Sequence, residues 1–277
     1  MRSIAIMNQK GGVGKTTTAV NLSAAIADAG FRVCLVDLDP QAHASLHFGI
    51  SLDDSEDSIY RVLLGDLPIS EIRIRVDDHL WVVPSHIDLA AAEMELAAEV
   101  GREIILRNQL QYDEDQFDYL ILDCPPSLGV LTLNALTAAQ EVFLPLQPHF
   151  LALHGLSKLL RTIQIVTNRL NQSLRLSGVV YCMYETGTKL AAEVVNDVDA
   201  FFAEARNTDT IWSAAKSFET KIRRNIRLAE APSFGQSIFQ YAPQSNGALD
   251  YKALALEVLN GHQPSAEQLS EIAAAHA

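Results

Sequence analysis

Cysteine, long apolar runs and metal-ligand spacings are all scarce in this chain of 277 residues. Its three cysteines, Cys34, Cys124 and Cys182, each lie in or beside an apolar stretch, and no two of them form a C-x-x-C pair. This pattern argues against a disulfide framework or a cysteine-held metal cluster, and it predicts buried thiols in a reducing compartment. The eight histidines are scattered, so we assign none of them to a metal.

Membrane and export signals are missing from the sequence as well. No apolar run approaches the roughly 18 residues that a membrane span needs. Met1-Arg2-Ser3 leads straight into an apolar segment, so we expect no signal peptide. The segment 263–277 carries acids but no lysine or arginine, and so lacks the basic amphipathic helix that an anionic membrane surface requires. These absences predict a cytoplasmic protein that does not bind membranes.

Positive charge is scarce overall but concentrated in one place. The formal net charge of −13 argues against gross nonspecific affinity for DNA. Between residues 216 and 228, however, five lysines and arginines stand against a single acid, Glu219. This segment predicts a local basic surface on an otherwise acidic protein.

Composition and hydrophobic patterning indicate a globular α/β protein. Hydrophobic residues make up 48% of the chain and charged residues 20%, and neither a repeat nor a low-complexity linker is evident. We predict one domain over residues 1–262 and a polar, acidic tail over 263–277. Runs of consecutive apolar residues predict strands that are buried on both faces, and helical spacing predicts helices between them. The strands are expected near 33–36, 80–85, 119–122, 142–146 and 178–183, and helices near 89–110 and 152–169.

A glycine-rich stretch, residues 8–18, dominates the sequence. An apolar run precedes it, and a helical pattern with Ala19, Leu22 and Ile26 follows it, which gives the order strand, turn, helix. Glycines allow successive backbone N–H groups to turn toward an anion, and the helix N-terminus adds partial positive charge. In such a loop Lys15 reaches the β- and γ-phosphates of a nucleotide, and the Thr16 hydroxyl binds Mg²⁺.

The loop departs from the general pattern G-x-x-x-x-G-K-[ST] at its first position. That position is Gln9, and a second lysine, Lys10, follows it. Lys10 cannot easily serve the same phosphates from the same side as Lys15. It is either a solvated loop lysine or a charge that contacts a nucleotide held by another subunit, and we favour the second interpretation.

Acidic residues end two of the predicted strands. Asp37 and Asp39 follow the strand at 33–36, and Asp123 follows the strand at 119–122. In open α/β sheets this carboxyl edge is where ligands bind. Asp123 would hold Mg²⁺, mostly through water. The first pair could also be an ordinary acidic turn.

These motifs together resemble the ParA/MinD family of deviant Walker A ATPases, and in particular its ParA (Soj-like) branch. Lys10–Thr16 resembles the family's deviant Walker A box, whose leading lysine is called the signature lysine. In the Walker A′ box of the family, the residue matching Asp39 positions the attacking water and the residue matching Asp37 supports the Mg²⁺ shell. Residues 223–235 resemble the family segment P-R-N-V-R-L-S-E-A-P-S-H-G, with Arg223 in place of the proline.

The resemblance and the residue pattern give a set of candidate site residues. Lys10, Lys15 and Asp39 are the expected catalytic residues, and Thr16, Asp37 and Asp123 the expected metal site. The expected nucleotide contacts are Gly11, Gly12, Val13, Gly14, Lys15, Thr16, Thr17, Met183 and Arg223. The expected DNA contacts are Lys189, Lys221, Arg223, Arg224 and Arg227.

The resemblance implies a fold and a function. The fold is a doubly wound, mostly parallel twisted sheet with helices on both faces. The implied activity is Mg²⁺-dependent ATP hydrolysis by a homodimer that forms on ATP binding, holds DNA nonspecifically on the nucleoid, and is released when a ParB-like adaptor stimulates hydrolysis. One alternative is a related ATPase that positions a protein cargo. Another is an ATP-dependent amidotransferase of the cobyric acid type, which usually needs a nucleophilic cysteine.

Overall fold

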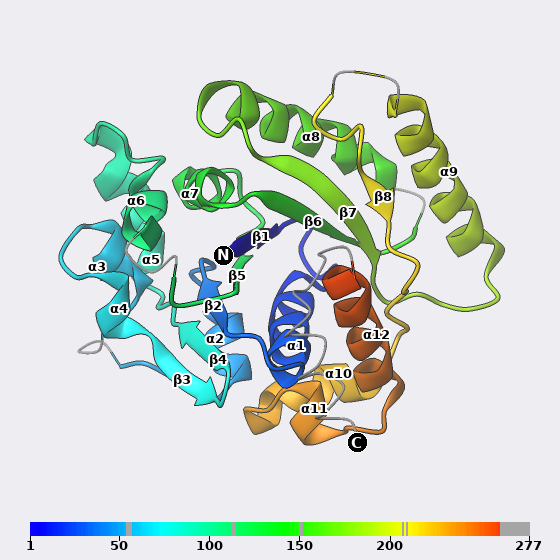
Figure 1. Ribbon diagram of the computed structural model, residues 1–277, viewed down its shortest axis with the longest axis horizontal. Coiled ribbons are helices and arrows are strands. Elements are labelled where there is room, and N and C mark those ends of the chain that lie inside the picture. Colours follow the sequence, from blue (N-terminus) through cyan, green and yellow to red (C-terminus); the bar gives the residue numbers. More distant parts are fainter. Residues whose placement is uncertain (54–56, 112–114, 150–151, 207, 209, 261–277) are drawn as a thin grey trace.

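An eight-stranded sheet forms the centre of the molecule (Figure 1). The computed structural model describes residues 1–53, 57–111, 115–149, 152–206, 208 and 210–260, so the predicted tail at 263–277 lies outside the described residues. The strand order is β3-β4-β2-β5-β1-β6-β7-β8. All neighbouring strands are parallel except β3 and β4, which are antiparallel. The strands are β1 (Arg2–Ile6), β2 (Val33–Asp37), β3 (Ile74–Asp77), β4 (Leu80–Val83), β5 (Tyr119–Asp123), β6 (Glu141–Leu146), β7 (Arg175–Tyr181) and β8 (Lys216–Ser217).

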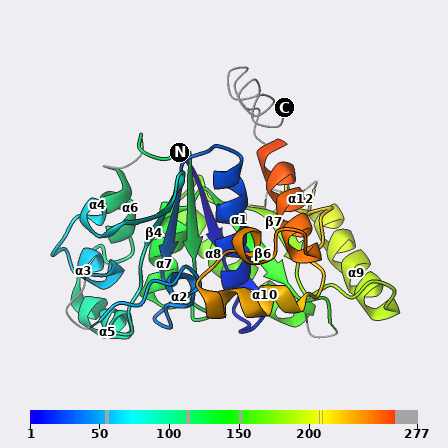
Figure 2. The ribbon, with the colours of Figure 1, turned by 90° about the horizontal axis from the view of Figure 1, so that it is seen from below.

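Helices cover both faces of this sheet, as Figures 1 and 2 show, and this confirms the predicted fold class. One face packs against α1 (Lys15–Asp28), α11 (Ile238–Tyr241) and α12 (Asn246–Asn260). The opposite face packs against α3 (Ile59–Leu63), α5 (Leu89–Glu95), α6 (Ile105–Leu110), α7 (Val130–Ala138), α8 (Ala152–Arg169) and α9 (Lys189–Ala205). The remaining short helices are α2 (His43–His47), α4 (Ile69–Ile72), η1 (Leu96–Ala98), α10 (Ile226–Glu230) and η3 (Ala231–Phe234).

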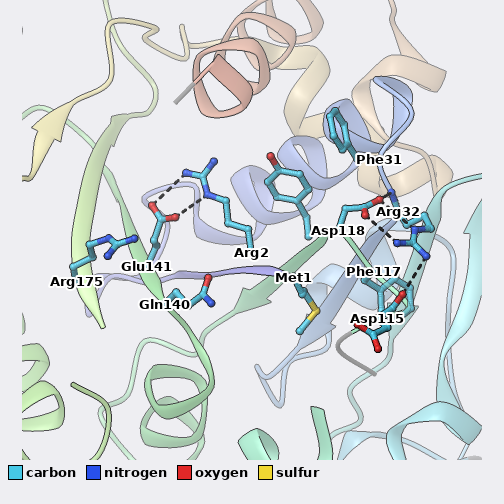
Figure 3. A pocket seen from close by; sticks show the side chains of 11 residues that line it. Met1, Arg2, Phe31, Arg32, Asp115, Phe117, Asp118, Gln140, Glu141 and Arg175 are labelled. Atoms are coloured by element: carbon cyan, nitrogen blue, oxygen red, sulfur yellow. Dashed lines mark hydrogen bonds and ion pairs between the residues drawn. The ribbon is translucent and has the colours of Figure 1, made fainter. Parts of the chain in front are cut away.

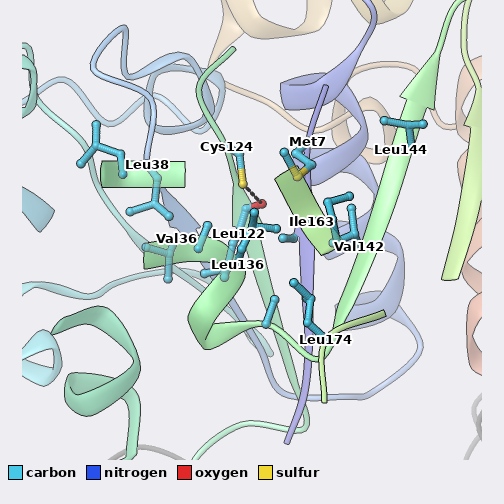
Figure 4. Close-up of a cluster of buried hydrophobic side chains, with 14 of the residues drawn as sticks. Met7, Val36, Leu38, Leu122, Cys124, Leu136, Val142, Leu144, Ile163 and Leu174 are labelled. Carbon is cyan, nitrogen blue, oxygen red and sulfur yellow. Dashed lines mark hydrogen bonds between the residues drawn. The ribbon is translucent and has the colours of Figure 1, made fainter. Parts of the chain in front are cut away.

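The central strands are apolar on both faces because helices cover both. Every residue of β2, β5 and β6 is buried. Figure 4 shows Leu122 and Val142 from the sheet beside Leu136 of α7 and Ile163 of α8. All three cysteines are buried in these cores, as predicted. Within the described part of the chain, no helix is both long and apolar enough to cross a membrane.

The predicted continuous helix at 89–110 is wrong. The chain forms α5 and η1, then turns at Gly101, whose φ of 79° is left-handed, before α6 begins. Side chains of α7 fasten this turn: Asn134 Nδ2 donates to the carbonyl of Arg102 at 2.7 Å, and Asn134 Oδ1 accepts from Leu106 N at 3.0 Å. These are tertiary contacts, which the local helical pattern does not encode. The helix expected at 152–169 is confirmed as α8.

Parallel pairing places the acidic strand ends side by side. Asp123 at the end of β5 lies opposite Asp37 of β2 on one side and Ile6 of β1 on the other. The glycine-rich loop leaves β1 at this same edge and leads into α1. The fold therefore brings the loop and both acidic motifs to one edge of the sheet.

Candidate functional site

Glycines shape the loop between β1 and α1. Gly12 and Gly14 have φ values of 70° and 93°, and Gly14 occupies the N-cap position of α1. A Cβ atom added to Gly14 would lie 3.2 Å from both Cβ and Sγ of Cys182, whereas one on Gly11 or Gly12 would meet nothing within 4 Å. The loop thus leaves open space on its outer side, where its backbone N–H groups can approach an anion.

Replacing Gly14 with alanine is therefore expected to destabilise the unliganded protein by about 1–3 kcal/mol, the usual cost of a strained non-glycine backbone. The added methyl group also presses on the buried Cys182. Urea denaturation of the ligand-free protein measures this change. Gly11→Ala is the matched control, because the φ of Gly11 is not left-handed and an added Cβ there would meet only open space. Equal stability of the two variants would contradict the assignment of strain to Gly14.

Lys15 is the buried cation of the loop. It is only 7% exposed, and its Nζ donates to the carbonyl oxygen of Lys10 at 3.2 Å. Burial lowers the pKa of Lys15, and the carboxylates of Asp123 and Asp39 partly offset this effect. A buried ammonium group next to a glycine-rich loop with open space around Gly11 and Gly12 is suited to binding a phosphate.

Asp123 is a buried carboxylate with little hydrogen bonding from the described part of the chain. It is fully buried, and neither of its oxygens has a hydrogen-bond partner at bonding distance in the described part of the chain. Burial first, and the Asp37 carboxylate second, raise its pKa well above the ordinary value, while the Thr16 hydroxyl and the Lys15 ammonium act in the opposite direction. Such a group is costly to bury alone, so a bound cation would complete its environment.

Asp37 is also fully buried but has ample hydrogen bonding. Its Oδ2 accepts from the backbone N and the Oγ of Ser45 at 2.9 and 2.8 Å, and its Oδ1 accepts from Asp39 N at 3.1 Å. Burial raises its pKa to about 6. With its oxygens so occupied, Asp37 can support a metal shell by holding Asp39 in place.

Two serines extend this network, and the sequence analysis missed both. Ser45 Oγ accepts from Ser85 N at 3.0 Å, and Ser85 Oγ donates to the carbonyl of Asp39 at 2.8 Å. Ser85 follows β4 at the same carboxyl edge, and this position is the one signal in the sequence that could have indicated it. The serines hold the half-buried Asp39 at the rim of the site.

Lys10, unlike Lys15, lies on the surface. Its backbone N donates to Asn8 Oδ1 at 3.0 Å, and Asn8 Nδ2 donates to the carbonyl of Pro145 at 2.8 Å, which ties the loop to the end of β6. The Nζ of Lys10 contacts Nε2 of His149, on the loop beyond β6. The exposed ammonium is therefore placed where a second molecule could reach it.

A cavity of about 480 Å³ adjoins the glycine-rich loop. The predicted contacts Met183 and Arg223 both line it, together with Tyr251, whose hydroxyl lies 3.1 Å from Thr18 Oγ1. The carboxylate of Asp250 holds Arg223 in place. It accepts hydrogen bonds from the backbone N of Arg223 at 2.9 Å and from Nη2 of Arg223 at 2.6 Å. The cavity wall also includes Gly12, Gly14, Thr17, Cys182, Ile222, Arg224, Asn225, Ile226, Leu228 and Ala229. Its position beside the phosphate loop suits a nucleotide base.

A second cavity, of about 510 Å³, lies at the opposite, amino edge of the strands (Figure 3). Arg2 pairs there with Glu141 at 2.7 Å, and Arg32 pairs with Asp118 at 3.0 Å. No predicted site residue lines this cavity. Arg2 and Arg32 are thus engaged by acidic partners on this side of the sheet.

The predicted DNA contacts gather on neighbouring segments. Tyr184 forms a parallel bridge with Arg223, so the loop after β7 lies beside residues 221–227. Lys221 Nζ stands 5.0 Å from the centre of the Tyr184 ring, and Lys189 begins α9 at the end of this loop. The arginines have acidic neighbours: Arg224 pairs with Glu185 at 3.3 Å and Arg227 with Glu230 at 2.8 Å.

This fold and site define a P-loop nucleotide-binding protein. Comparison with known proteins supports this class: a family model described as an AAA domain matches residues 1–176. The sporulation initiation inhibitor protein Soj of Bacillus subtilis is 44% identical over 256 residues, which cover 92% of this chain and 97% of Soj. The chromosome partitioning protein ParA of Myxococcus xanthus is 44% identical over 264 residues, covering 95% and 89% of the two chains. The chain belongs to the ParA/Soj family of ATPases, as the sequence motifs indicated.

Among solved structures, a protein that is not named for partition has a similar fold. The cobyrinic acid a,c-diamide synthase of Mycobacterium smegmatis, with bound ATP analog and magnesium, superposes with a TM-score of 0.79. It is 37% identical, and the match covers 94% of this chain and 95% of that one. The shared fold is thus compatible with two kinds of ATP-dependent protein.

Proposed function

We propose that this chain is a DNA-partition ATPase whose ATP-bound dimer holds DNA and releases it after hydrolysis. The Soj and ParA proteins that it resembles carry partition names, and the similarity spans nearly the whole chain. ATP and Mg²⁺ are the ligands of this site, in keeping with the M. smegmatis structure that contains an ATP analog and magnesium. The observation that carries the proposal is the buried Asp123 carboxylate, whose oxygens have no hydrogen-bond partner at bonding distance among the described residues, beside the buried Lys15.

The residues present fit a magnesium ion. The unpartnered oxygens of Asp123 and the nearby Thr16 hydroxyl are oxygen ligands of the kind that Mg²⁺ prefers. Thr16 and Asp123 would hold the ion, with Asp37 supporting the shell through Asp39. When bound, Mg²⁺ supplies positive charge to the phosphate oxygens. Lys15 binds the phosphates, and Asp39 orients the attacking water.

The exposed position of Lys10 supports the proposed dimer. Its ammonium group is exposed at the surface, while Lys15 is the buried cation of the same loop. In the proposed dimer, Lys10 of each protomer contacts the nucleotide of the other, so ATP binding and pairing are coupled. Pairing also brings two DNA-contacting surfaces into one assembly, and each phosphate contact adds to nonspecific affinity. The proposed partners are therefore a second copy of this chain, nonspecific DNA of the nucleoid and a ParB-like adaptor protein.

The DNA surface is tested by removing two exposed arginines. Arg224→Ala combined with Arg227→Ala is expected to weaken ATP-dependent binding to random-sequence DNA by at least about tenfold and to flatten its salt dependence, since each lost phosphate contact lowers the slope by about one. A gel shift that compares ATP with ADP measures this, and nucleotide affinity is measured in parallel because Arg224 also lines the cavity beside the glycine-rich loop.

The matched control for this variant is Arg61→Ala with Arg75→Ala, which removes the same charge from exposed arginines near the other end of the sheet. Wild-type binding that is absent, or equal with ATP and ADP, would contradict the proposed function. A protein cargo in place of DNA remains the nearest alternative within the family. A neighbouring gene that encodes a DNA-binding adaptor would favour the partition role.

An amidotransferase activity, suggested by the name of the M. smegmatis neighbour, lacks a nucleophile in this chain. All three cysteines are buried, and burial raises the pKa of the Cys124 thiol far above its ordinary value. A thiol in that state is inert toward glutamine. ATP turnover that requires a small metabolite, rather than DNA and a partner protein, would revive this second function.

A further inference from the structure

The basic surface around residues 216–228 carries less net charge in the fold than in the sequence. Four carboxylates from other parts of the chain approach it. Asp250 and Glu257 of α12, Glu230 at the end of α10, and Glu185 on the loop after β7 all contact this surface. The cations predicted to contact DNA are therefore largely balanced in the free protomer.

Three of these carboxylates also have structural partners. Asp250 accepts from Arg223 N at 2.9 Å, and Glu257 accepts from the backbone N of Glu219 and Thr220 at 2.8 and 3.1 Å. Glu230 accepts from the Tyr241 hydroxyl at 2.9 Å. These interactions hold the segment in place.

Glu185 differs from the other three. Within the described part of the chain, its carboxylate meets only Arg224, with Nε and Oε1 3.3 Å apart and the two side chains 65% and 56% exposed. Its backbone position is fixed, because Tyr184 N donates to Ile222 O at 2.9 Å and Arg224 N donates to Tyr184 O at 3.2 Å. The Thr188 hydroxyl also donates to the Glu185 carbonyl at 3.0 Å. The fold thus holds an acid against a DNA-contacting arginine without any evident structural need for that acid.

We propose that Glu185 is a built-in competitor for DNA, which masks Arg224 and keeps the affinity of a single protomer low. The proposal rests on the DNA binding proposed above. An exposed ion pair contributes at most about 1 kcal/mol, so a DNA phosphate can displace Glu185 from Arg224. The displaced carboxylate still lies near that phosphate and repels it. Two masked surfaces in an ATP-bound dimer can hold DNA together, whereas one masked surface releases it.

The test is Glu185→Gln, assayed by fluorescence anisotropy with random-sequence duplex DNA at several salt concentrations. We expect DNA affinity in the ATP state to increase by about tenfold, because each of the two protomers contributes a gain of roughly threefold and the two gains multiply. The slope of log affinity against log salt should steepen by about 0.9 per protomer. The variant should also gain measurable DNA binding with ADP, where the wild type has little.

The matched control is Asp57→Asn, which changes net charge equally. Asp57 pairs with Arg61 at 2.7 Å, and both side chains are similarly exposed. This pair lies at the start of α3, far in the sequence from the basic surface and near the other end of the sheet. Arg224→Ala supplies a double-mutant cycle, because Glu185→Gln should lose most of its effect once Arg224 is absent. Thermal unfolding of each variant checks that the fold is retained.

The outcomes separate this proposal from the proposed function. Tighter DNA binding by Glu185→Gln alone, dependent on Arg224, supports the mask. Affinity equal to that of the wild type or of Asp57→Asn, while the wild type still binds DNA with ATP, overturns the mask and leaves the partition function intact. Absence of DNA binding by both the wild type and Glu185→Gln overturns both.

Discussion

Replacing Lys10 with alanine is expected to lower ATP turnover by about 10³-fold and to abolish ATP-driven pairing, while each protomer still binds ATP. The magnitude is that of a cation supplied across an interface to a phosphoryl-transfer transition state. The structure supports the separation of roles, because Lys15 is buried beneath the loop whereas the Lys10 ammonium reaches the surface at His149. Steady-state hydrolysis and analytical ultracentrifugation with a non-hydrolysable analogue measure the two effects.

Mixing two inactive variants tests whether Lys10 acts on the neighbouring site. A Lys10→Ala protomer retains Asp39, and an Asp39→Ala protomer retains Lys10. If Lys10 acts across the interface, a mixed dimer contains one complete site and recovers activity when the two proteins are combined. Lys158→Ala is the control for loss of an exposed lysine on the surface of α8. Full pairing and turnover by Lys10→Ala would show that the exposed lysine has no role in the switch.

The parts of the site that a single stretch of chain encodes could be predicted from the sequence. The glycine-rich loop, Lys15 and Asp123 follow from strand–turn–helix order and from acids at strand ends, and the parallel sheet brings them together. Ser45 and Ser85 could not be predicted in this way. Their contacts with Asp37 and Asp39 depend on how α2 and β4 pack against β2.

The net charge of the basic surface is a second property that one segment of the chain does not determine. The local excess of lysine and arginine at 216–228 predicted a basic surface. Folding brings Glu185, which precedes this segment by 31 or more residues, and Asp250 and Glu257 of α12 against the segment. Positive and negative charges on the surface are therefore nearly equal. Counting charges along a segment predicts a surface only when no other segment contributes to it. Likewise, Asn134 of α7 stabilises the turn at Gly101, a tertiary contact that the helical pattern of residues 89–110 does not encode.

Asp123→Asn is expected to have opposite effects on stability and on activity. The substitution removes a buried ionisable group whose oxygens have no hydrogen-bond partner at bonding distance among the described residues and whose pKa burial raises, so the metal-free protein should gain at least about 1 kcal/mol, or roughly 2–4 °C in Tm, at neutral pH. It also removes a magnesium ligand, so hydrolysis should fall by about a hundredfold or more, since the ion contributes several kcal/mol to transition-state stabilisation. Calorimetry without metal, together with an ATPase assay, measures the two effects.

The pH dependence of this stability gain has a definite sign. The pKa of Asp123 is raised in the folded protein, so the folded state holds its proton more tightly than the unfolded chain does. Its penalty is absent in acid, below the unfolded pKa of about 3.8, and grows as pH rises toward the folded pKa. The Tm advantage of Asp123→Asn should therefore be present at pH 7.5 and vanish near pH 3.5. Asp37, whose folded pKa is about 6, adds a parallel loss of metal-free stability between about pH 3.8 and 6.

Asp37→Asn is the matched control, because Asp37 and Asp123 are paired in register on adjacent strands and both are fully buried. Asp37 accepts hydrogen bonds on both oxygens, from Ser45 and from Asp39 N. An asparagine amide has one acceptor oxygen, so this substitution leaves a buried donor unpaired and should destabilise the metal-free protein by about 1–3 kcal/mol. A gain in one carboxamide variant and a loss in its neighbour would locate the metal ligand at Asp123. Destabilisation by both would mean that Asp123 is held by the protein itself.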